Sequence, residues 1–222
     1  MPFAEYVPEK ATSSGNSLPL IISLHGAGSE KGGTSSELLS SHFPSLITNW
    51  ESTGLKNIPA IMIAPHLDYK DSNKGWGTTR AIQSIKAIVE YAKEKYNIDT
   101  NRVVLIGFSL GGTGVYKVSG ENQDLFSSIV VVSSDKTELE QKYIDYYKKI
   151  PMKGYSEAGT VGNAMTNCFN SINHSSDLTI YDGYNHGDMP RVSLTEDKNN
   201  DGISDLIQWA LSQNKSSSGN NT

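Results

Sequence analysis

The chain has 222 residues, of which 36% are hydrophobic and 19% are charged, and its formal net charge is -5 at pH 7. This length and apolar content predict one domain with one substantial core. A negative net charge without any basic run argues against a nucleic acid or an anionic membrane surface as a partner, and no apolar run approaches the ~20 residues of a membrane span.

Short apolar runs alternate along the chain with longer segments of helical period. The runs cover residues 19–26, 59–65, 102–108, 127–134, 150–156 and 178–184, and they are rich in the Val, Ile and Leu of strands that are buried on both faces. Candidate helices lie near 37–50, 78–95, 111–119, 136–149, 161–172 and 203–212. The alternation predicts an α/β fold, with a mostly parallel, doubly wound sheet flanked by helices.

The two ends of the chain carry separate expectations. Residues 1–213 are expected to form one catalytic domain, and the Ser- and Asn-rich residues 214–222 are expected to be a flexible tail or a linker to a further module. The N-terminus has no signal-peptide pattern, which leaves both a cytoplasmic and an exported protein open. The lone cysteine, Cys168, permits no internal disulfide, and its context indicates a small core residue.

The stretch LIGFSLGG, residues 105–112, follows one predicted strand and opens a predicted helix. This is the context of a nucleophile elbow, in which a strained turn exposes the serine of G-x-S-x-G and glycines avoid collisions with the neighbouring elements. We therefore predict Ser109 as the nucleophile. The first backbone N–H of the helix, that of Leu110, would stabilise negative charge on a substrate oxygen.

The stretch LHGAGSE, residues 24–30, forms a second loop at the end of a predicted strand. Gly26 and Gly28 are small enough to let the backbone approach a substrate, and the N–H of Ala27 would supply the second oxyanion-hole donor. We interpret His25 as a brace for this loop and not as a proton carrier.

A general base for Ser109 is expected in the loop after the last strand, where His186 lies. The acid that orients this histidine is expected at the end of a strand between the two. Glu157 meets that requirement, and Asp135 meets it one strand earlier. The usual order favours Glu157, while Asp182 and Asp188 are weaker candidates.

Taken together, these motifs resemble those of the α/β-hydrolase superfamily, and the chain is similar to compact carboxylesterases such as esterase D, feruloyl esterases and polyhydroxybutyrate depolymerases. The resemblance covers most of the chain. It rests on LHGAG at 24–28, IAPH at 63–66, GWG at 75–77 and YNIDTNRVVLIGFSLGG at 96–112. The last stretch resembles the family block K-Y-x-I-D-x-x-R-V-Y-x-x-G-x-S-x-G-G, which is far more specific than G-x-S-x-G alone.

The resemblance implies an α/β-hydrolase fold with Ser109 as nucleophile, His186 as base, and Ala27 and Leu110 as oxyanion-hole donors. It also implies that Trp76 lies beside the substrate cleft, with packing in the core as the alternative. The family's strand-end motif H-G-x-x-D appears here as KGYSE at residues 153–157, with glutamate for aspartate and lysine for histidine.

The short connection near residues 135–149 leaves no room for a large lid domain, which suits a small-molecule or polymer-borne ester substrate. The expected reaction is ester hydrolysis through an acyl-enzyme, without any cofactor. A peptidase or amidase that uses the same residues stays open, as does a non-catalytic binding module.

The stretch 197–205 contains Asp197, Asn199 and Asp201 at the alternate positions of a calcium loop. It lacks the terminal bidentate glutamate, because Gln208 occupies that position. The alternative is a polar loop that caps the next helix.

Overall fold

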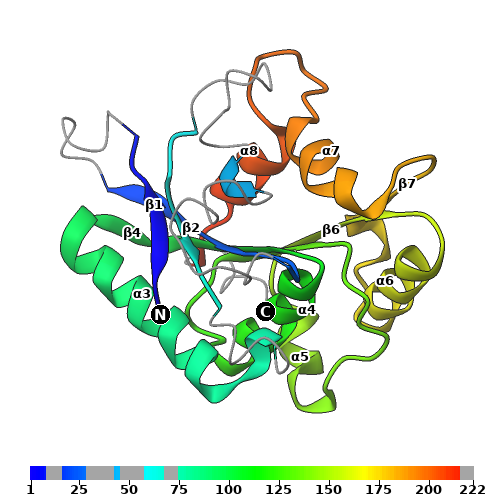
Figure 1. Cartoon of the computed structure of the whole chain (residues 1–222), viewed down its shortest axis with the longest axis horizontal. Coiled ribbons are helices and arrows are strands. Elements are labelled where there is room, and N and C mark those ends of the chain that lie inside the picture. Colours follow the sequence, from blue (N-terminus) through cyan, green and yellow to red (C-terminus); the bar gives the residue numbers. More distant parts are fainter. Residues whose placement is uncertain (9–16, 29–42, 46–57, 68–74, 216–222) are drawn as a thin grey trace.

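One sheet of seven strands organises the computed structural model, which describes residues 1–8, 17–28, 43–45, 58–67 and 75–215 (Figure 1). The strand order is β1-β3-β2-β4-β5-β6-β7. Only the edge strand β1 is antiparallel to its neighbour, and all other pairs are parallel. The strands are β1 (Phe3–Tyr6), β2 (Leu18–Leu24), β3 (Ile61–Pro65), β4 (Ile98–Phe108), β5 (Ser128–Val132), β6 (Met152–Glu157) and β7 (Leu178–Tyr181).

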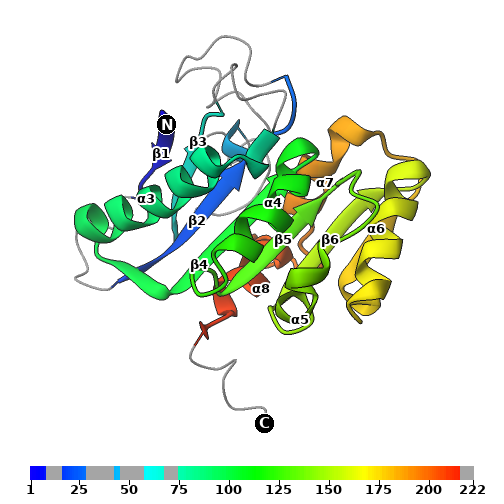
Figure 2. The same ribbon diagram turned by 90° about the horizontal axis from the view of Figure 1, so that it is seen from below.

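Helices cover both faces of this sheet (Figures 1 and 2). One layer consists of α3 (Thr79–Tyr96), α4 (Leu110–Glu121), α5 (Ile144–Tyr147) and α6 (Thr160–Ser171), and the other of α7 (Met189–Thr195) and α8 (Asp205–Ser212). Successive strand residues point to opposite faces, so Leu105 packs in the first layer while Val104 and Ile106 pack in the second. Two apolar cores therefore enclose the central strands, which is why these strands are almost entirely hydrophobic.

The predicted fold class is confirmed, and all six predicted strand runs contain a strand. Strand β1 was not predicted, because its four residues FAEY show neither an apolar run nor a clear alternation. Helix α7 was also not predicted, since it has only seven residues and carries Pro190 in its first turn. The predicted helix at 37–50 lies largely outside the described residues, of which 43–45 are helical.

The helix predicted at 136–149 is wrong. Residues 135–140 are not helical, and only a 3-10 turn, η4 (Gln141–Tyr143), and the single turn of α5 follow. The carbonyl of Lys136 accepts a hydrogen bond from the thiol of Cys168 at 3.1 Å, so this carbonyl is held by α6. Tyr147 then donates its hydroxyl to the Tyr116 carbonyl of α4 at 2.6 Å. Tertiary contacts thus override the helical pattern.

The connection between β5 and β6, residues 133–151, is described in full and holds only these two short turns. It contains no lid domain, in agreement with the prediction. At the end of the described chain, Lys215 donates to the backbone carbonyls of Asp124 and Leu125 at 3.1 and 3.4 Å. Within the described ranges, no helix has both the length and the apolar character that spanning a bilayer requires.

Candidate active site

The predicted nucleophile, Ser109, lies between the last residue of β4 and the first residue of α4. Its backbone is in a strained region, with φ 55° and ψ -117°. The Ser109 N–H donates to the Val132 carbonyl of β5 at 2.9 Å, and Thr113 N–H donates to the Ser109 carbonyl at 2.9 Å, which begins the helix. The sheet and the helix therefore fix this turn from both sides.

Glycines make the turn sterically feasible. A Cβ on Gly107 would overlap the Gly111 carbonyl, and a Cβ on Gly111 would overlap the Leu24 carbonyl of β2. A Cβ on Gly112 would lie 2.7 Å from the Val132 carbonyl. The glycines thus let α4 start directly against β2 and β5, which places the serine at the carboxyl edge of the sheet.

His186 and Glu157 meet Ser109 in one hydrogen-bonded chain. His186 begins the 3-10 turn η6 (His186–Asp188), and Glu157 is the last residue of β6. The His186 Nδ1 lies 2.7 Å from Glu157 Oε1, and its Nε2 lies 2.9 Å from Ser109 Oγ. Because an ionised carboxylate can only accept, Nδ1 carries the proton and Nε2 accepts from the serine hydroxyl. The imidazole also packs on Phe108, with ring centroids 4.9 Å apart.

The carboxylate of Glu157 is nearly buried, with a side chain that is 10% exposed against 44% for His186. Burial alone would raise the pKa of Glu157, but hydrogen bonds from Ser133 and His186 outweigh it and lower the pKa below its ordinary value. Ser133 donates to Oε2 at 2.6 Å, and Ser156 approaches the same oxygen at 3.4 Å. The charged form of this acid is therefore favoured at neutral pH.

The sequence motifs did not single out Ser133. It follows β5 within the pair SS at residues 133–134, and its backbone has a positive φ of 49° that a serine rarely adopts. A serine does not indicate such a conformation in advance, whereas a glycine at this position would have done so. The one sequence signal for Ser133 was its position directly after β5, at the carboxyl edge of the sheet where Ser109 also lies.

The loop after β2 lies against the nucleophile. A Cβ on Gly26 would be 3.3 Å from Ser109 Cβ and 3.1 Å from a ring carbon of Phe108. Ala27 and Gly28 are exposed, and Gly28 has a φ of 97°. Leu110 is the first residue of α4, so its N–H precedes the intrahelical hydrogen bonds. The placement of Gly26, Ala27 and Leu110 around Ser109 is compatible with an oxyanion hole.

His25 braces the loop after β2, as the sequence predicts. It is buried, its Nε2 accepts from Leu67 N–H at 3.0 Å, and its Nδ1 lies 2.8 Å from the Gly26 carbonyl. Since Nε2 accepts, Nδ1 holds the proton and donates to Gly26. The neutral ring thus ties the loop to the chain beyond β3.

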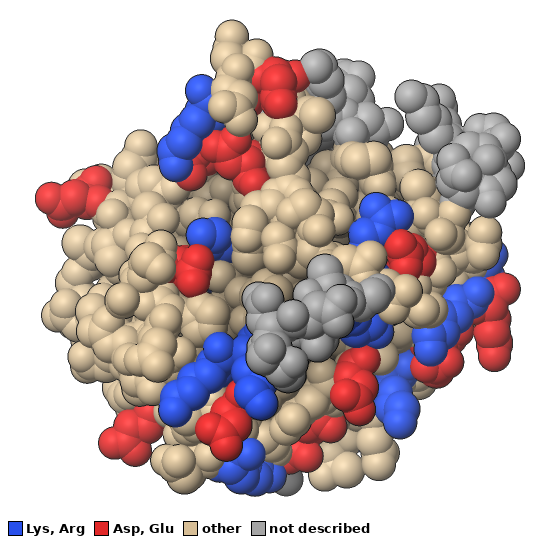
Figure 3. Space-filling model, turned by 180° about the vertical axis from the view of Figure 1, so that it is seen from behind, with Lys and Arg blue, Asp and Glu red and all other residues tan. Residues whose placement is uncertain are grey.

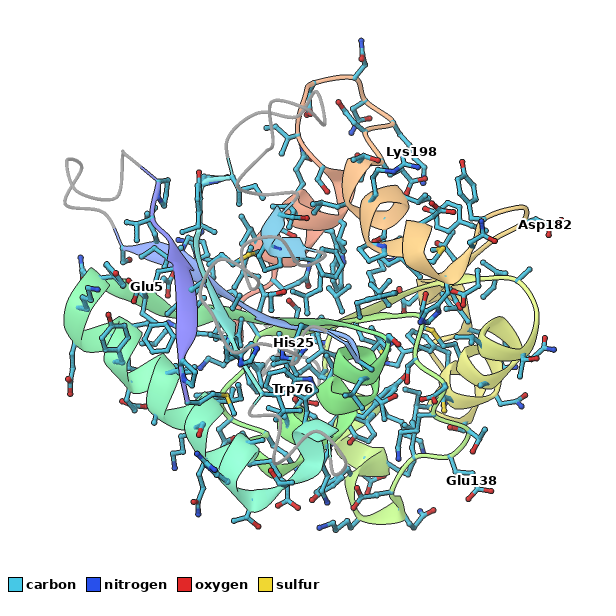
Figure 4. All side chains as sticks on the ribbon, in the orientation of Figure 1. Glu5, His25, Trp76, Glu138, Asp182 and Lys198 are labelled. Atoms are coloured by element: carbon cyan, nitrogen blue, oxygen red, sulfur yellow. The ribbon has the colours of Figure 1, made fainter. Side chains whose placement is uncertain are left out.

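Trp76 lies beside His25, as Figure 4 shows, with ring centroids 5.0 Å apart. Its indole N–H donates to the His25 carbonyl at 3.0 Å, and the residue is 1% exposed. A Cβ on Gly114 of α4 would collide with it. This burial fits the alternative of core packing and does not fit direct contact with a substrate.

The other candidate acids have other partners or are exposed. Asp135 accepts from the Thr113 hydroxyl at 3.0 Å, and Asp188 caps its own turn by accepting from Asn185 N–H at 3.0 Å. Asp182 is exposed and lies at the outer end of the loop that follows β7 (Figure 4). Among the four carboxylates weighed from the sequence, Glu157 is the one bonded to His186.

The carboxylates of the calcium-like stretch bond to their own loop. Asp197 accepts from the backbone N–H groups of Asp201 and Gly202 at 3.1 and 2.8 Å, and Asp201 accepts from Ile203 N–H at 2.9 Å. Ser204 caps α8 by accepting from Ile207 N–H at 3.3 Å. These contacts fit a polar loop that caps α8, which was the alternative to a calcium loop. No group of three His, Cys, Asp or Glu that could hold a metal occurs in the described part of the chain.

Comparisons with known proteins place this chain in a family. A model described as the prolyl oligopeptidase family matches residues 68–181, just over half of the chain. No curated protein matches the sequence. Among solved structures, a thermostable esterase is similar with a TM-score of 0.73 and 19% identity, over 96% of this chain. The chain spans only 59% of the length of that esterase.

Two further solved structures are similar over most of their own length. A feruloyl esterase module from Clostridium thermocellum has a TM-score of 0.64 and 12% identity, over 87% of this chain and 80% of the module. An S-formylglutathione hydrolase from Agrobacterium tumefaciens has a TM-score of 0.61 and 12% identity, over 95% of this chain and 89% of the hydrolase. These likenesses and the sheet order confirm the α/β-hydrolase fold. The chain belongs to the prolyl oligopeptidase family.

Proposed function

We propose that this chain hydrolyses carboxylic esters through an acyl-enzyme, with Ser109 as nucleophile, His186 as base and Glu157 as acid. The observation that carries the proposal is the unbroken chain of hydrogen bonds from Glu157 Oε1 through His186 to Ser109 Oγ. The esterases among the similar structures support it.

In the first step, His186 Nε2 takes the hydroxyl proton as Ser109 Oγ attacks the ester carbonyl carbon. The backbone N–H groups of Ala27 and Leu110 stabilise the oxyanion. When the intermediate collapses, the alkoxide leaves with the proton from His186, and the acyl group stays on Ser109. Water then attacks the acyl-enzyme while His186 Nε2 takes a proton from it. As the second intermediate collapses, His186 returns that proton to Ser109 Oγ, and the carboxylic acid is released. No step draws on a metal or organic cofactor, so we propose that none is required.

We propose a soluble or polymer-borne ester as the substrate, because the β5–β6 connection carries no lid over the site. The surface charge does not favour a nucleic acid or an anionic membrane. Figure 3 shows Lys and Arg interspersed with Asp and Glu over the face that it displays. Several of the basic groups are paired, as Lys117 is with Glu121 and Glu140 at 3.1 and 2.9 Å.

The decisive experiment is hydrolysis of p-nitrophenyl acetate by the wild-type chain and by Ser109→Ala. We expect the variant to fold with an unchanged circular dichroism spectrum and to lose more than about 99.9% of kcat/KM. A fluorophosphonate probe should label the wild-type chain and not the variant. Retention of most activity by Ser109→Ala would exclude this mechanism. A wild-type chain that neither hydrolyses the ester nor reacts with the probe would be a non-catalytic binding module.

A peptidase or amidase is the second candidate, and the match to the prolyl oligopeptidase family favours it. The same three residues would serve, since acyl transfer from an amide needs the same nucleophile, base and oxyanion donors. An ester and an anilide that share one acyl group, compared by kcat/KM, separate the two functions. We expect the ester to react and the anilide to react far more slowly. Similar values for both would assign peptidase or amidase chemistry.

A further inference from the structure

We infer that Ser133 is a positioning residue that fixes the carboxylate of Glu157 for its hydrogen bond with His186. The inference rests on the proposed function and extends it by a fourth residue. Ser133 is fully buried, and its hydroxyl donates to Glu157 Oε2 at 2.6 Å. Oε1 is thereby left to accept from His186 Nδ1 at 2.7 Å.

The backbone around Ser133 is built for this contact. The parallel pairing of β4, β5 and β6 continues one residue beyond the strands, since Ser109 N–H donates to the Val132 carbonyl and Ser133 N–H donates to the Tyr155 carbonyl, at 2.9 and 2.8 Å. Ser133 then turns out of the strand with a φ of 49°. A left-handed serine costs about 1 kcal/mol, so the surrounding structure holds a conformation that the residue disfavours by itself.

A glutamate needs such a partner more than an aspartate does. Its side chain has one additional rotatable bond, so the position of its carboxylate is less fixed by the backbone. The two short contacts, Ser133 to Oε2 and His186 to Oε1, hold the carboxylate at both oxygens. The Ser156 hydroxyl also approaches Oε2, but at 3.4 Å, and it bonds the Glu157 carbonyl at 3.1 Å. Ser133 is therefore the principal donor to Oε2.

The fixed carboxylate matters most when charge develops on the base. Glu157 stabilises the imidazolium that forms as Ser109 attacks, and it does so only while Oε1 faces His186 Nδ1. Loss of the Ser133 hydroxyl therefore weakens an interaction that is strongest in the transition state. Such a loss lowers kcat and leaves KM little changed.

The test compares Ser133→Gly with the wild-type chain. Glycine accepts the positive φ, so the substitution removes the hydroxyl without adding backbone strain. We expect kcat/KM for p-nitrophenyl acetate to fall about tenfold, the rate equivalent of one hydrogen bond to a charged group. We also expect this loss to fall in kcat, with KM little changed. Ser133→Thr retains the hydroxyl but adds a methyl at a left-handed, buried position, so it should lose stability while it keeps most of the wild-type kcat.

Ser128→Ala is the matched control, because Ser128 is a fully buried serine at the opposite end of β5, where its hydroxyl lies 3.4 Å from the Ala210 carbonyl. It should lose some thermal stability and keep the wild-type kcat and KM. An unchanged kcat in Ser133→Gly, a loss that appears only as a higher KM, or an equal loss of kcat in Ser128→Ala would overturn the inference. A wild-type chain without esterase activity would instead contradict the proposed function, before any Ser133 variant is compared.

Discussion

At the scale of single residues, the charge on Glu157 determines which tautomer His186 adopts. An ionised carboxylate can only accept a hydrogen bond, so it holds the imidazole proton on Nδ1 and leaves Nε2 to accept the hydrogen bond of the Ser109 hydroxyl. A side chain of the same shape that can also donate would permit the opposite tautomer, in which Nε2 carries the proton and cannot act as a base.

Glu157→Gln tests this dependence on charge. We expect the variant to fold and to lose about a thousandfold in kcat with p-nitrophenyl acetate, because the amide stabilises neither the correct tautomer nor the imidazolium. Asp135→Ala is the control, since Asp135 contacts Thr113 and not His186. It should retain nearly full activity. Equal and mild losses in both variants would mean that another group orients the histidine.

Single residues also show how far the sequence could predict the site. A motif marks Ser109, and chain order marks His186. Glu157 could be preferred over Asp135 because it ends the penultimate strand of the pattern, and its contact with His186 agrees with that preference. Trp76 and Ser133 could not be placed, because burial of the first and the left-handed backbone of the second depend on contacts between distant segments.

At the scale of elements, α4 can approach the sheet closely because Gly111 has no side chain. Any Cβ on Gly111 would occupy the space of the Leu24 carbonyl, which belongs to the backbone of β2 and cannot move away without breaking the sheet. The glycines around the nucleophile thus serve the packing of helix on strand as much as the turn itself.

Gly111→Ala should therefore destabilise the protein by more than about 3 kcal/mol in urea unfolding, or prevent folding. Gly77→Ala is the matched control. A Cβ there would lie 3.5 Å from Lys117 Cγ, an ordinary contact, and Gly77 has no positive φ. We expect this variant to change stability by less than about 1 kcal/mol. Similar stabilities of the two variants would contradict the packing argument.

The loop between α7 and α8 allows a test of whether it binds calcium. Because Asp197 and Asp201 already accept hydrogen bonds from their own backbone, we expect the loop to hold its shape without a cation. The melting temperature should be the same in EDTA and in millimolar calcium chloride. A clear rise with calcium, and not with magnesium, would revive the calcium loop that its aspartate spacing indicates.

Elements also differ in how well the sequence predicted them. The central strands and α3 were predicted, because long apolar runs and a 3.6-residue stripe are strong local signals. Helix α3 also has a local start signal, since Thr78 accepts from Ala81 N–H at 3.1 Å. The segment 136–149 was not predicted correctly, because contacts with α4 and α6 determine its course.

At the scale of the whole molecule, stability should depend on pH through its paired carboxylates. Burial alone would raise the pKa values of Glu5, Asp99, Glu157 and Asp177, but hydrogen bonds from their partners lower all four. A group with a lowered pKa in the folded state contributes stability above its unfolded pKa. That contribution is lost as the pH falls through the folded pKa.

The urea midpoint should accordingly stay constant from about pH 7 to about pH 5 and fall steadily toward about pH 3. The Lys153–Asp177 pair at 2.9 Å offers a check, because Asp177→Asn should reduce the acid-dependent loss. A midpoint that is flat down to pH 3, or one that rises, would show that these carboxylates are not stabilised in the folded chain.

The proposed nucleophile and base come from opposite sides of the sheet. Ser109 opens α4 in one helical layer, whereas His186 lies in the turn that leads directly into α7 in the other. Along the chain, Ser109 and Glu157 come before residue 180 and His186 comes after it, so His186 is synthesised last of the three. Activity that depends on the proposed triad therefore requires the segment from His186 into α7 to be in place, so the appearance of that activity during refolding would report the packing of this segment.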